Sequence, residues 1–234
     1  MTETSETADE DPITSERDRM VTAILDDVAF DGWTAALVPM AAERTGVDIT
    51  AARMAFPRGG LDMAIHFHRM GDRHLADELA RRDARGEPLG AMRIRDRITH
   101  CVRRRIELIG DHREAVRRAG SLFALPTNAP EGMRLIWETA DQIWTVCGDT
   151  SEDYNWYTKR GILASVYSAT VLYWLGDQDP RGEPTWEFLD RRIENVMQFE
   201  QVKAQMQKNP VARAAFAVPM GLLSMVRAPG AGRI

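Results

Sequence analysis

The chain contains 234 residues, of which 44% are hydrophobic and 28% charged, and its formal net charge is -5. This composition can form a buried core and excludes an intrinsically disordered protein, while the acidic balance argues against a general affinity for nucleic acid or anionic membranes. Cys101 and Cys147 stand in apolar helical patterns without CxxC or Cys-His spacing, so we expect buried free thiols and a cytoplasmic protein.

The amino-terminal residues 1–14 are expected to form a disordered, solvated acidic tail. The first eleven of them include no basic side chain and no apolar run, and their carboxylates are Glu3, Glu6, Asp9, Glu10 and Asp11. This pattern argues against a secretory signal and against a basic transit peptide.

From Ser15 onward, nearly every long segment has helical periodicity, and none alternates apolar and polar residues long enough for a strand, so the predicted fold class is all-α. Glycine and proline breaks divide this part into ten expected helices. Their approximate ranges are 15–31, 34–45, 48–56, 60–85, 93–109, 113–124, 131–147, 155–176, 184–208 and 211–226. The predicted domains are a subdomain at 15–63, a ligand-binding and dimerisation domain at 64–208, and a terminal segment at 209–234.

The first three helices resemble the helix-turn-helix of TetR-type regulators over about residues 17–63. In such regulators the third helix enters the major groove and presents its first residues to the bases. Here Asp48 begins that helix with the wrong charge for phosphate, and Arg53 is its only cation. We therefore expect a degenerate helix-turn-helix that keeps its packing and binds no nucleic acid. The alternative is a TetR-type transcriptional regulator that senses a lipophilic ligand.

No catalytic site, metal site or cofactor is predicted. His66 and His68 are two residues apart and point to different faces of a helix. The pairs Asp62/His66 and Asp96/His100 have a spacing that is common on ordinary helix surfaces. The sequence also has no Glu-x-x-His, His-Glu-x-x-His, glycine-rich phosphate loop or nucleophile elbow, so we expect a protein that is not an enzyme.

The segment from Asp153 to Ile193 is rich in aromatic residues in a chain that is otherwise poor in them. Polar residues are interleaved with aromatic rings at its beginning, where DYNWYTKR places Lys159 and Arg160 close to Trp156. Such a mixture is typical of interfaces, and filling of a core is the alternative.

Residues 211–227, VARAAFAVPMGLLSMVR, form an amphipathic pattern with Arg213 and Arg227 on its polar side. The run is shorter than the roughly 20 apolar residues that a membrane span needs, and it contains Pro219 and Gly221. The pattern alone fits two arrangements: the helix packs on its own domain or on a partner subunit, or it lies on a membrane surface. The candidate membrane-binding residues are Arg213, Phe216, Val218, Met220, Leu222, Leu223, Met225 and Val226.

The run DYNWYTKR, followed by VYSATVLYWLGD and TWEFLDRRI, resembles the signature of the coenzyme Q biosynthesis protein nine family over about residues 150–200. The resemblance implies a dimeric, TetR-like helical protein with a lipid pocket and an amphipathic carboxy-terminal helix. It implies a non-enzymatic accessory protein of ubiquinone biosynthesis that presents isoprenoid quinone intermediates to the di-iron demethoxyubiquinone hydroxylase. The ligand would be an isoprenoid lipid or a phospholipid, bound at a membrane. Because no transit peptide is expected, that membrane would be the cytoplasmic membrane of a bacterium, at its inner face.

The resemblance also suggests particular site residues. Matching positions for docking of the hydroxylase are Asp153, Asn155, Trp156, Tyr157 and Arg160, and the alternative is that Trp156 and Tyr157 plug the lipid cavity from inside. The helices at 93–109, 113–124, 131–147 and 155–176 would enclose the pocket. Its candidate walls are Ile106, Ile109, Leu122, Phe123, Ile136, Trp137, Ile143, Trp144, Val166 and Trp174, for which plain core packing is the alternative. The helices at 155–176 and 184–208 would form the dimer contact.

Overall fold

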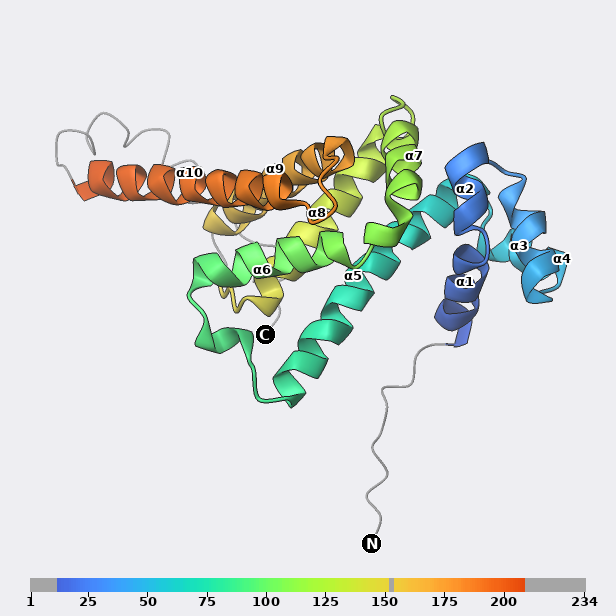
Figure 1. Ribbon diagram of the computed structural model, residues 1–234, viewed down its shortest axis with the longest axis horizontal. Helices are drawn as coiled ribbons and strands as arrows, with labels where there is room; N and C mark the ends of the chain where they lie inside the picture. Colours follow the sequence, from blue (N-terminus) through green and yellow to red (C-terminus); the bar gives the residue numbers. More distant parts are fainter. Residues whose placement is uncertain (1–11, 152–153, 209–234) are drawn as a thin grey trace, which may run out of the picture. The chain divides into compact units, whose positions relative to one another are not determined.

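The computed structural model describes residues 12–151 and 154–208, and within these residues it is all-helical, without strands (Figure 1). The α-helices are α1 (Pro12–Thr22), α2 (Leu25–Asp31), α3 (Leu37–Thr45), α4 (Ile49–Ala55), α5 (Gly60–Ala84), α6 (Ile94–Glu107), α7 (Arg113–Phe123), α8 (Ala129–Val146), α9 (Tyr154–Gly176) and α10 (Glu183–Lys208). Short 3-10 turns lie at Leu89–Ala91 and Gly110–His112. The predicted all-α fold class is confirmed.

Most predicted helices agree with the observed ones to within one turn, but the helix expected at 15–31 is two helices. The chain leaves helical geometry at Ile24, which has φ -118° and ψ 4°. Its amide donates to the Val21 carbonyl at 3.2 Å, which closes a tighter turn between α1 and α2. The break lets both short helices bury apolar side chains, because Val21, Ile24 and Val28 are all fully buried. The helix expected at 211–226 lies outside the described residues.

The described residues divide into two compact units, and the first comprises residues 12–73 together with 109–132. Its core is formed by Met20, Val21, Ile24, Leu25, Val28, Trp33, Leu37, Val38, Ala41, Ala42, Ala52, Phe56, Met63, Ala64, Phe67, Met70, Ala115 and Ala119. The Trp33 indole donates a buried hydrogen bond of 3.0 Å to the Ala115 carbonyl, which fixes α7 in this unit. The α7 helix, which packs on α2, therefore belongs to this unit together with the four helices that precede α5.

Within the first unit, α3 and α4 retain the turn of a helix-turn-helix. Gly46 has φ +72°, a left-handed conformation that glycine adopts without a steric penalty. Asp48 then caps α4, since its carboxylate accepts hydrogen bonds from the Thr50 and Ala51 amides at 2.8 and 3.1 Å. At the start of α5, a Cβ on Gly60 would lie 2.2 Å from the Trp33 carbonyl oxygen, so this close approach requires glycine.

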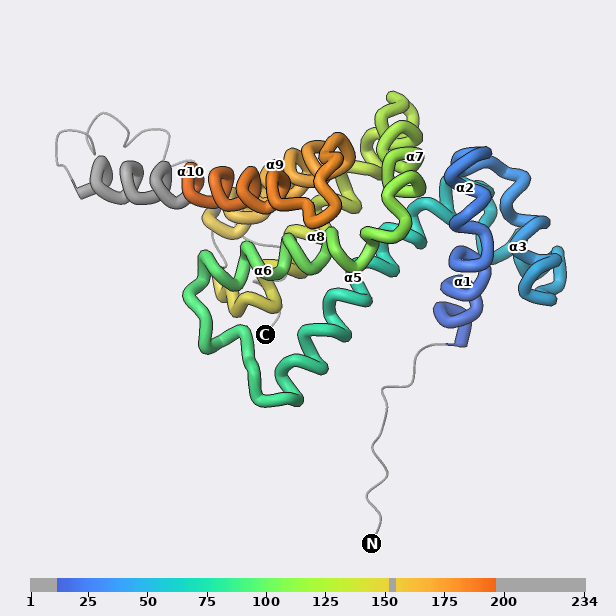
Figure 2. Tube along the Cα trace, viewed as in Figure 1, coloured from blue at the N-terminus to red at the C-terminus, as the bar shows by residue number. Residues whose placement is uncertain are grey.

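Among the described residues, the second unit comprises 74–108, 133–151 and 154–208, and it contains the rest of α5 and α8 together with α6, α9 and α10. The α9 and α10 helices lie side by side, and α10 also packs on α6 (Figure 2). Asp177 fixes the turn between α9 and α10 because its carboxylate accepts hydrogen bonds from the Thr185 amide and hydroxyl, at 3.1 and 2.5 Å. None of the helices in the described ranges is long and apolar enough to span a membrane.

Candidate functional site

A predominantly apolar pocket of about 280 Å³ lies within the second unit. Four helices line it: Ile94 and Ile98 come from α6, Trp144 from α8, Asn155, Thr158, Lys159, Ile162, Leu163 and Val166 from α9, and Ile193 and Val196 from α10. Sites for small molecules usually have volumes of roughly 300–1,000 Å³. The pocket is therefore suited to a short apolar segment and is too small for an entire long-chain lipid.

The pocket has an apolar interior and a more polar, exposed edge. Leu163, Val166 and Ile193 are buried and provide the interior. Asn155 is exposed, and Ile94 is 40% exposed, which places these residues at the opening. A ligand that enters here would bury apolar surface inside the pocket and keep a polar end near Asn155.

Trp144 and Lys159 form one wall of the pocket through two contacts. The Trp144 indole donates a hydrogen bond of 3.0 Å to the backbone carbonyl of Lys159. The Lys159 ammonium lies 5.3 Å from the centre of the Trp144 ring, within the range of a cation–π contact. These contacts join α8 to α9 directly at the pocket.

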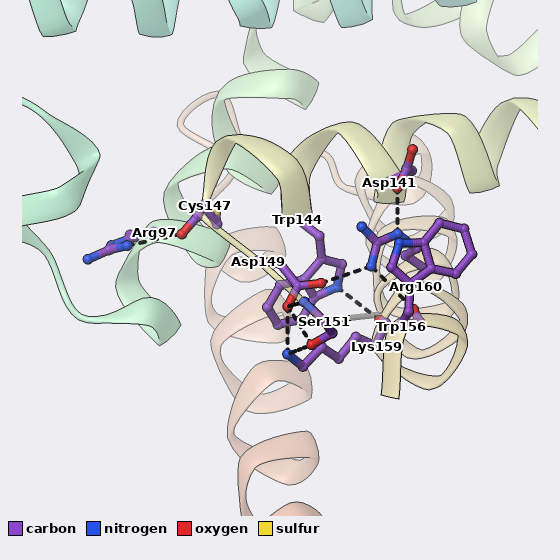
Figure 3. Close-up of polar contacts among 9 residues, drawn as sticks. All are labelled: Arg97, Asp141, Trp144, Cys147, Asp149, Ser151, Trp156, Lys159 and Arg160. Atoms are coloured by element: carbon purple, nitrogen blue, oxygen red, sulfur yellow. Dashed lines mark hydrogen bonds and ion pairs between the residues drawn. The ribbon is translucent and has the colours of Figure 1, made fainter. Parts of the chain in front are cut away.

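Asp149 follows the end of α8 and accepts hydrogen bonds from two consecutive residues of α9, Lys159 and Arg160 (Figure 3). One carboxylate oxygen accepts from the Lys159 ammonium at 2.6 Å and from the Ser151 hydroxyl at 2.8 Å. The other accepts from the Arg160 guanidinium at 2.9 Å. Burial raises the pKa of the Asp149 carboxyl, but the hydrogen bonds from Lys159, Arg160 and Ser151 outweigh burial and lower the pKa to about 2. Asp149 is therefore ionised at neutral pH and compensates the charge of Lys159.

Arg160 is a buried structural cation, with a side chain that is 3% exposed. Its guanidinium forms ion pairs with Asp141 and Asp149 and donates a hydrogen bond of 3.3 Å to the Trp156 carbonyl. It also lies 4.1 Å from the centre of the Trp156 ring (Figure 3). The family resemblance places Arg160 among the docking residues, but the structure buries it, because two carboxylates from α8 and the following loop enclose its charge.

Three aromatic rings gather where α8 meets the start of α9. Trp137 has ring-centroid distances of 5.9 Å to Trp156 and 6.3 Å to Tyr157, and the latter two rings contact each other edge-on at 4.8 Å. All three side chains are only partly buried. We call Trp137, Trp156 and Tyr157 the aromatic cluster. Trp156 and Tyr157 do not line the pocket described above, whereas Asn155 does, and Asp153 lies outside the described residues.

Only some of the residues predicted to line the pocket do so in the structure. Trp144 and Val166 line the pocket. Other candidates pack in the core or on the surface of the second unit, namely Ile106, Ile143 and Trp174, which are buried, and Ile136 and Trp137, which are partly buried. The remaining candidates are Ile109, Leu122 and Phe123, which belong to the first unit. The helix expected at 113–124 is α7, which packs on α2 in the first unit, and α10 lines the pocket described here.

Sequence reasoning missed most of the pocket lining. The missed apolar residues are Ile94, Ile98, Ile162, Leu163, Ile193 and Val196. Their spacing of three or four residues within α6 and α10 was an available signal, because such pairs share one helix face. The candidate membrane-binding residues from Arg213 to Val226 lie outside the described residues. Within the described ranges, no group of three or more His, Cys, Asp or Glu side chains is arranged to hold a metal ion.

A structural comparison shows the fold. A TetR transcriptional regulator from Nitrosomonas europaea superimposes with a TM-score of 0.62, covering 79% of this chain and 99% of the regulator at 18% sequence identity. The degree of identity supports a common fold and no more. The TetR-like architecture predicted from the first three helices is thereby confirmed.

Sequence comparisons identify the family. The profile of the COQ9 family matches residues 129–200, which contain the pocket wall from α8 and α9 and the aromatic cluster. The human mitochondrial ubiquinone biosynthesis protein COQ9 is 31% identical over 192 residues, covering 81% of this chain and 60% of the human protein. The Xenopus laevis protein COQ9-B is 31% identical over 212 residues, covering 88% of this chain and 69% of the relative. The chain spans about three fifths of the length of the rat and human relatives, covering 61% and 60% of them. Because it covers more than two thirds of COQ9-B at 31% identity, the chain belongs to the COQ9 family.

Proposed function

We propose that this chain is a non-enzymatic, lipid-binding accessory protein of ubiquinone biosynthesis. It binds isoprenoid quinone intermediates at a membrane and presents them to the di-iron demethoxyubiquinone hydroxylase. The observation that carries the proposal is the apolar pocket beside the aromatic cluster, within the segment that the COQ9 profile matches. The printed names of the relatives, ubiquinone biosynthesis proteins, supply the pathway.

The chemistry of the pocket favours an uncharged, apolar ligand segment. Lys159, the cation in its lining, is paired with Asp149 at 2.6 Å. An anionic lipid head group would have to compete with that carboxylate for Lys159. A neutral isoprenoid segment needs no such exchange, and each buried CH₂ contributes about 0.8 kcal/mol.

The aromatic cluster supports the docking part of the proposal. Partly exposed tryptophan and tyrosine side chains supply large contact areas and are common anchors of protein interfaces. The ring of Trp156 is held by Arg160, which is itself fixed by two carboxylates. A surface that is already ordered loses little conformational entropy when a partner binds.

An exposed apolar face on α9 and α10 supports the proposed homodimer. Leu172 is 71% exposed and Tyr173 is 39% exposed. The Tyr173 ring stacks on Phe188 at a centroid distance of 4.5 Å, and the Arg192 guanidinium lies 5.0 Å from the Phe188 ring. A second copy would cover these side chains. Leu172→Glu should therefore give a monomer in light scattering, whereas Thr145→Glu on the exposed side of α8 should remain a dimer.

We place the protein peripherally on the inner face of the cytoplasmic membrane, through residues 209–234. The terminal run VARAAFAVPMGLLSMVR combines apolar residues with flanking cations, the composition of interfacial helices. Sedimentation with anionic vesicles should retain the full chain and lose a chain that ends at Lys208. Equal sedimentation of both would contradict this assignment.

The alternative is a TetR-type regulator that senses a lipophilic ligand, which the structural comparison favours at the level of fold. The chemistry of α4 argues against it. The Ala51 and Thr50 amides donate hydrogen bonds to the Asp48 carboxylate, and these bonds lower its pKa. The start of α4 therefore keeps a negative charge where DNA would present phosphates. We expect no salt-dependent binding of duplex DNA in fluorescence anisotropy. Binding that Arg53→Glu abolishes would support the regulator.

Native mass spectrometry with added ubiquinone tests the proposed function. The wild-type chain should retain ubiquinone, and Val166→Phe, which fills the pocket, should lose it. Val171→Phe is the matched control, because Val171 lies on the same helix but outside the pocket lining. A wild-type protein that carries no lipid and refuses added ubiquinone would overturn the proposal.

A further inference from the structure

Asp149 lies between the apolar pocket and the aromatic cluster. Its carboxylate binds two consecutive residues of α9, Lys159 through one oxygen and Arg160 through the other. Lys159 lines the pocket, while Arg160 contacts Trp156 in the aromatic cluster. One carboxylate therefore touches both the pocket wall and the support of the aromatic cluster (Figure 3).

On the pocket side, three neighbouring side chains hold the Lys159 ammonium in place. The ammonium binds Asp149 at 2.6 Å and the Ser151 hydroxyl at 2.7 Å, and it lies over the Trp144 ring. Trp144 and Lys159 both line the pocket. The side chain of Lys159, which binds one oxygen of Asp149, is therefore exposed to a ligand that enters the pocket.

On the other side, the contacts lead to the aromatic cluster. The second oxygen of Asp149 lies 2.9 Å from the Arg160 guanidinium, which packs 4.1 Å from the centre of the Trp156 ring. The side chains of Asp149 and Arg160 are both 3% exposed. Water therefore cannot readily replace either partner, and buried ion pairs of this kind resist separation.

We propose that Asp149 is a positioning residue that couples occupancy of the pocket to the orientation of Trp156, and so to the affinity of the docking surface for its partner. The inference rests on the proposed function, since it concerns the same pocket and surface. A carboxylate is rigid and planar, so a displacement of Lys159 that moves one oxygen also moves the oxygen that holds Arg160. Coupling between binding sites is reciprocal, and factors of about 5 to 150 in affinity are typical.

Fluorine NMR of the full chain labelled with 5-fluorotryptophan tests the coupling without any partner protein. Trp144 reports on the pocket and Trp156 on the aromatic cluster, and Trp144→Phe and Trp156→Phe assign their resonances. The probe is a ubiquinone with two isoprene units. In the wild type, we expect the probe to shift both resonances. Trp156 is not part of the pocket lining, so its shift requires transmission.

Two variants cut the connection at different points, and a third is the control. Asp149→Asn removes the shared charge, and Lys159→Met interrupts only the pocket side, which keeps the test valid even if Asp149→Asn does not fold. In both variants the probe is titrated until the Trp144 resonance shifts, which shows that the pocket is occupied, and at that occupancy the Trp156 resonance should no longer shift. Asp141→Asn removes the other carboxylate from Arg160 but keeps the Asp149 contacts, so Trp156 should still respond.

The outcomes separate the inference from the function on which it rests. A wild-type Trp144 resonance that ignores the probe would overturn both the quinone ligand and the coupling. A wild-type Trp144 shift without a Trp156 shift would overturn the coupling alone. The coupling would also fall if Trp156 still responded in the folded Lys159→Met variant.

Discussion

Trp33 in the first unit and Trp156 in the second show how one residue type serves two purposes. Trp33 is 7% exposed, donates its indole N–H to a buried carbonyl and packs on Phe67 within a continuous apolar core. Trp156 is only partly buried, and a charged guanidinium and two other aromatic rings surround it. A tryptophan enclosed by apolar neighbours stabilises the fold, whereas Trp156, held by a buried ion pair, keeps part of its side chain exposed, as the proposed docking requires.

Replacement of Arg160 should have the largest effect on this comparison. Arg160→Leu leaves Asp149 buried without its guanidinium partner, and breaking a buried ion pair in this way typically costs about 3–5 kcal/mol. Urea unfolding measures the loss. Arg191→Ala is the matched control, because Arg191 forms an exposed pair with Glu187 that is worth about 1 kcal/mol or less. Equal losses for the two variants would mean that the Arg160 network stabilises the protein no more than an exposed ion pair does.

The two tryptophans that donate to backbone carbonyls should respond differently to phenylalanine. Trp33→Phe leaves the buried Ala115 carbonyl without that donor and should destabilise the protein by about 1–3 kcal/mol without changing ubiquinone retention. Trp144→Phe should cost less stability, because Trp144 is only partly buried, and should weaken ubiquinone retention. Thermal unfolding and native mass spectrometry measure the two properties. The opposite pattern would contradict the division between a structural and a ligand-facing tryptophan.

The ionised state of Asp149 should make the second unit sensitive to acid. Its pKa is lowered from 3.8 to about 2, so its stabilisation is complete above the unfolded pKa and is lost as the pH falls toward 2. The difference corresponds to about 2 kcal/mol. Urea unfolding between pH 7 and pH 3 should therefore show a weaker pH dependence for Asp149→Asn than for the wild type. Parallel curves would show that Asp149 does not contribute to the acid sensitivity.

The smallest effect is expected at the two cysteines, which are 0% and 1% exposed. The hydrogen bond with Cys147 and burial raise the pKa of the Cys101 thiol, which disfavours the reactive thiolate. A thiol-reactive disulfide reagent should label neither Cys101 nor Cys147 in the native protein and both in denaturant. Rapid labelling of the native chain would show that this part of the second unit opens readily.

The fold could be predicted largely from the sequence because helical periodicity and glycine or proline breaks are local signals. They gave α3 to α10 to within one turn, and they failed at Ile24, where the break involves neither glycine nor proline. The aromatic positions at the start of α9 could be recognised from DYNWYTKR.

The arrangement around those positions could not be predicted, because it depends on contacts between distant residues. Arg160 is buried by Asp141 and Asp149, which precede it by 19 and 11 residues. One wall of the pocket comes from α10, which follows the other lining helices in the chain. The α7 helix packs in the first unit, where Ala115 accepts a hydrogen bond from Trp33, 82 positions earlier. Periodicity shows that a helix has an apolar face, but it does not identify the helix that covers this face.

The pocket volume of about 280 Å³ has a consequence for ligand exchange. With the proposed ligand, only part of a long isoprenoid tail enters, so the remainder stays dissolved in the bilayer while the protein holds its segment. The protein could not then ferry the lipid through water, because the uncovered tail would meet solvent at about 0.8 kcal/mol for each CH₂. Delivery of the lipid to the hydroxylase would then depend on lateral diffusion within one leaflet of the membrane. The lipid would remain in that leaflet while both proteins bind it.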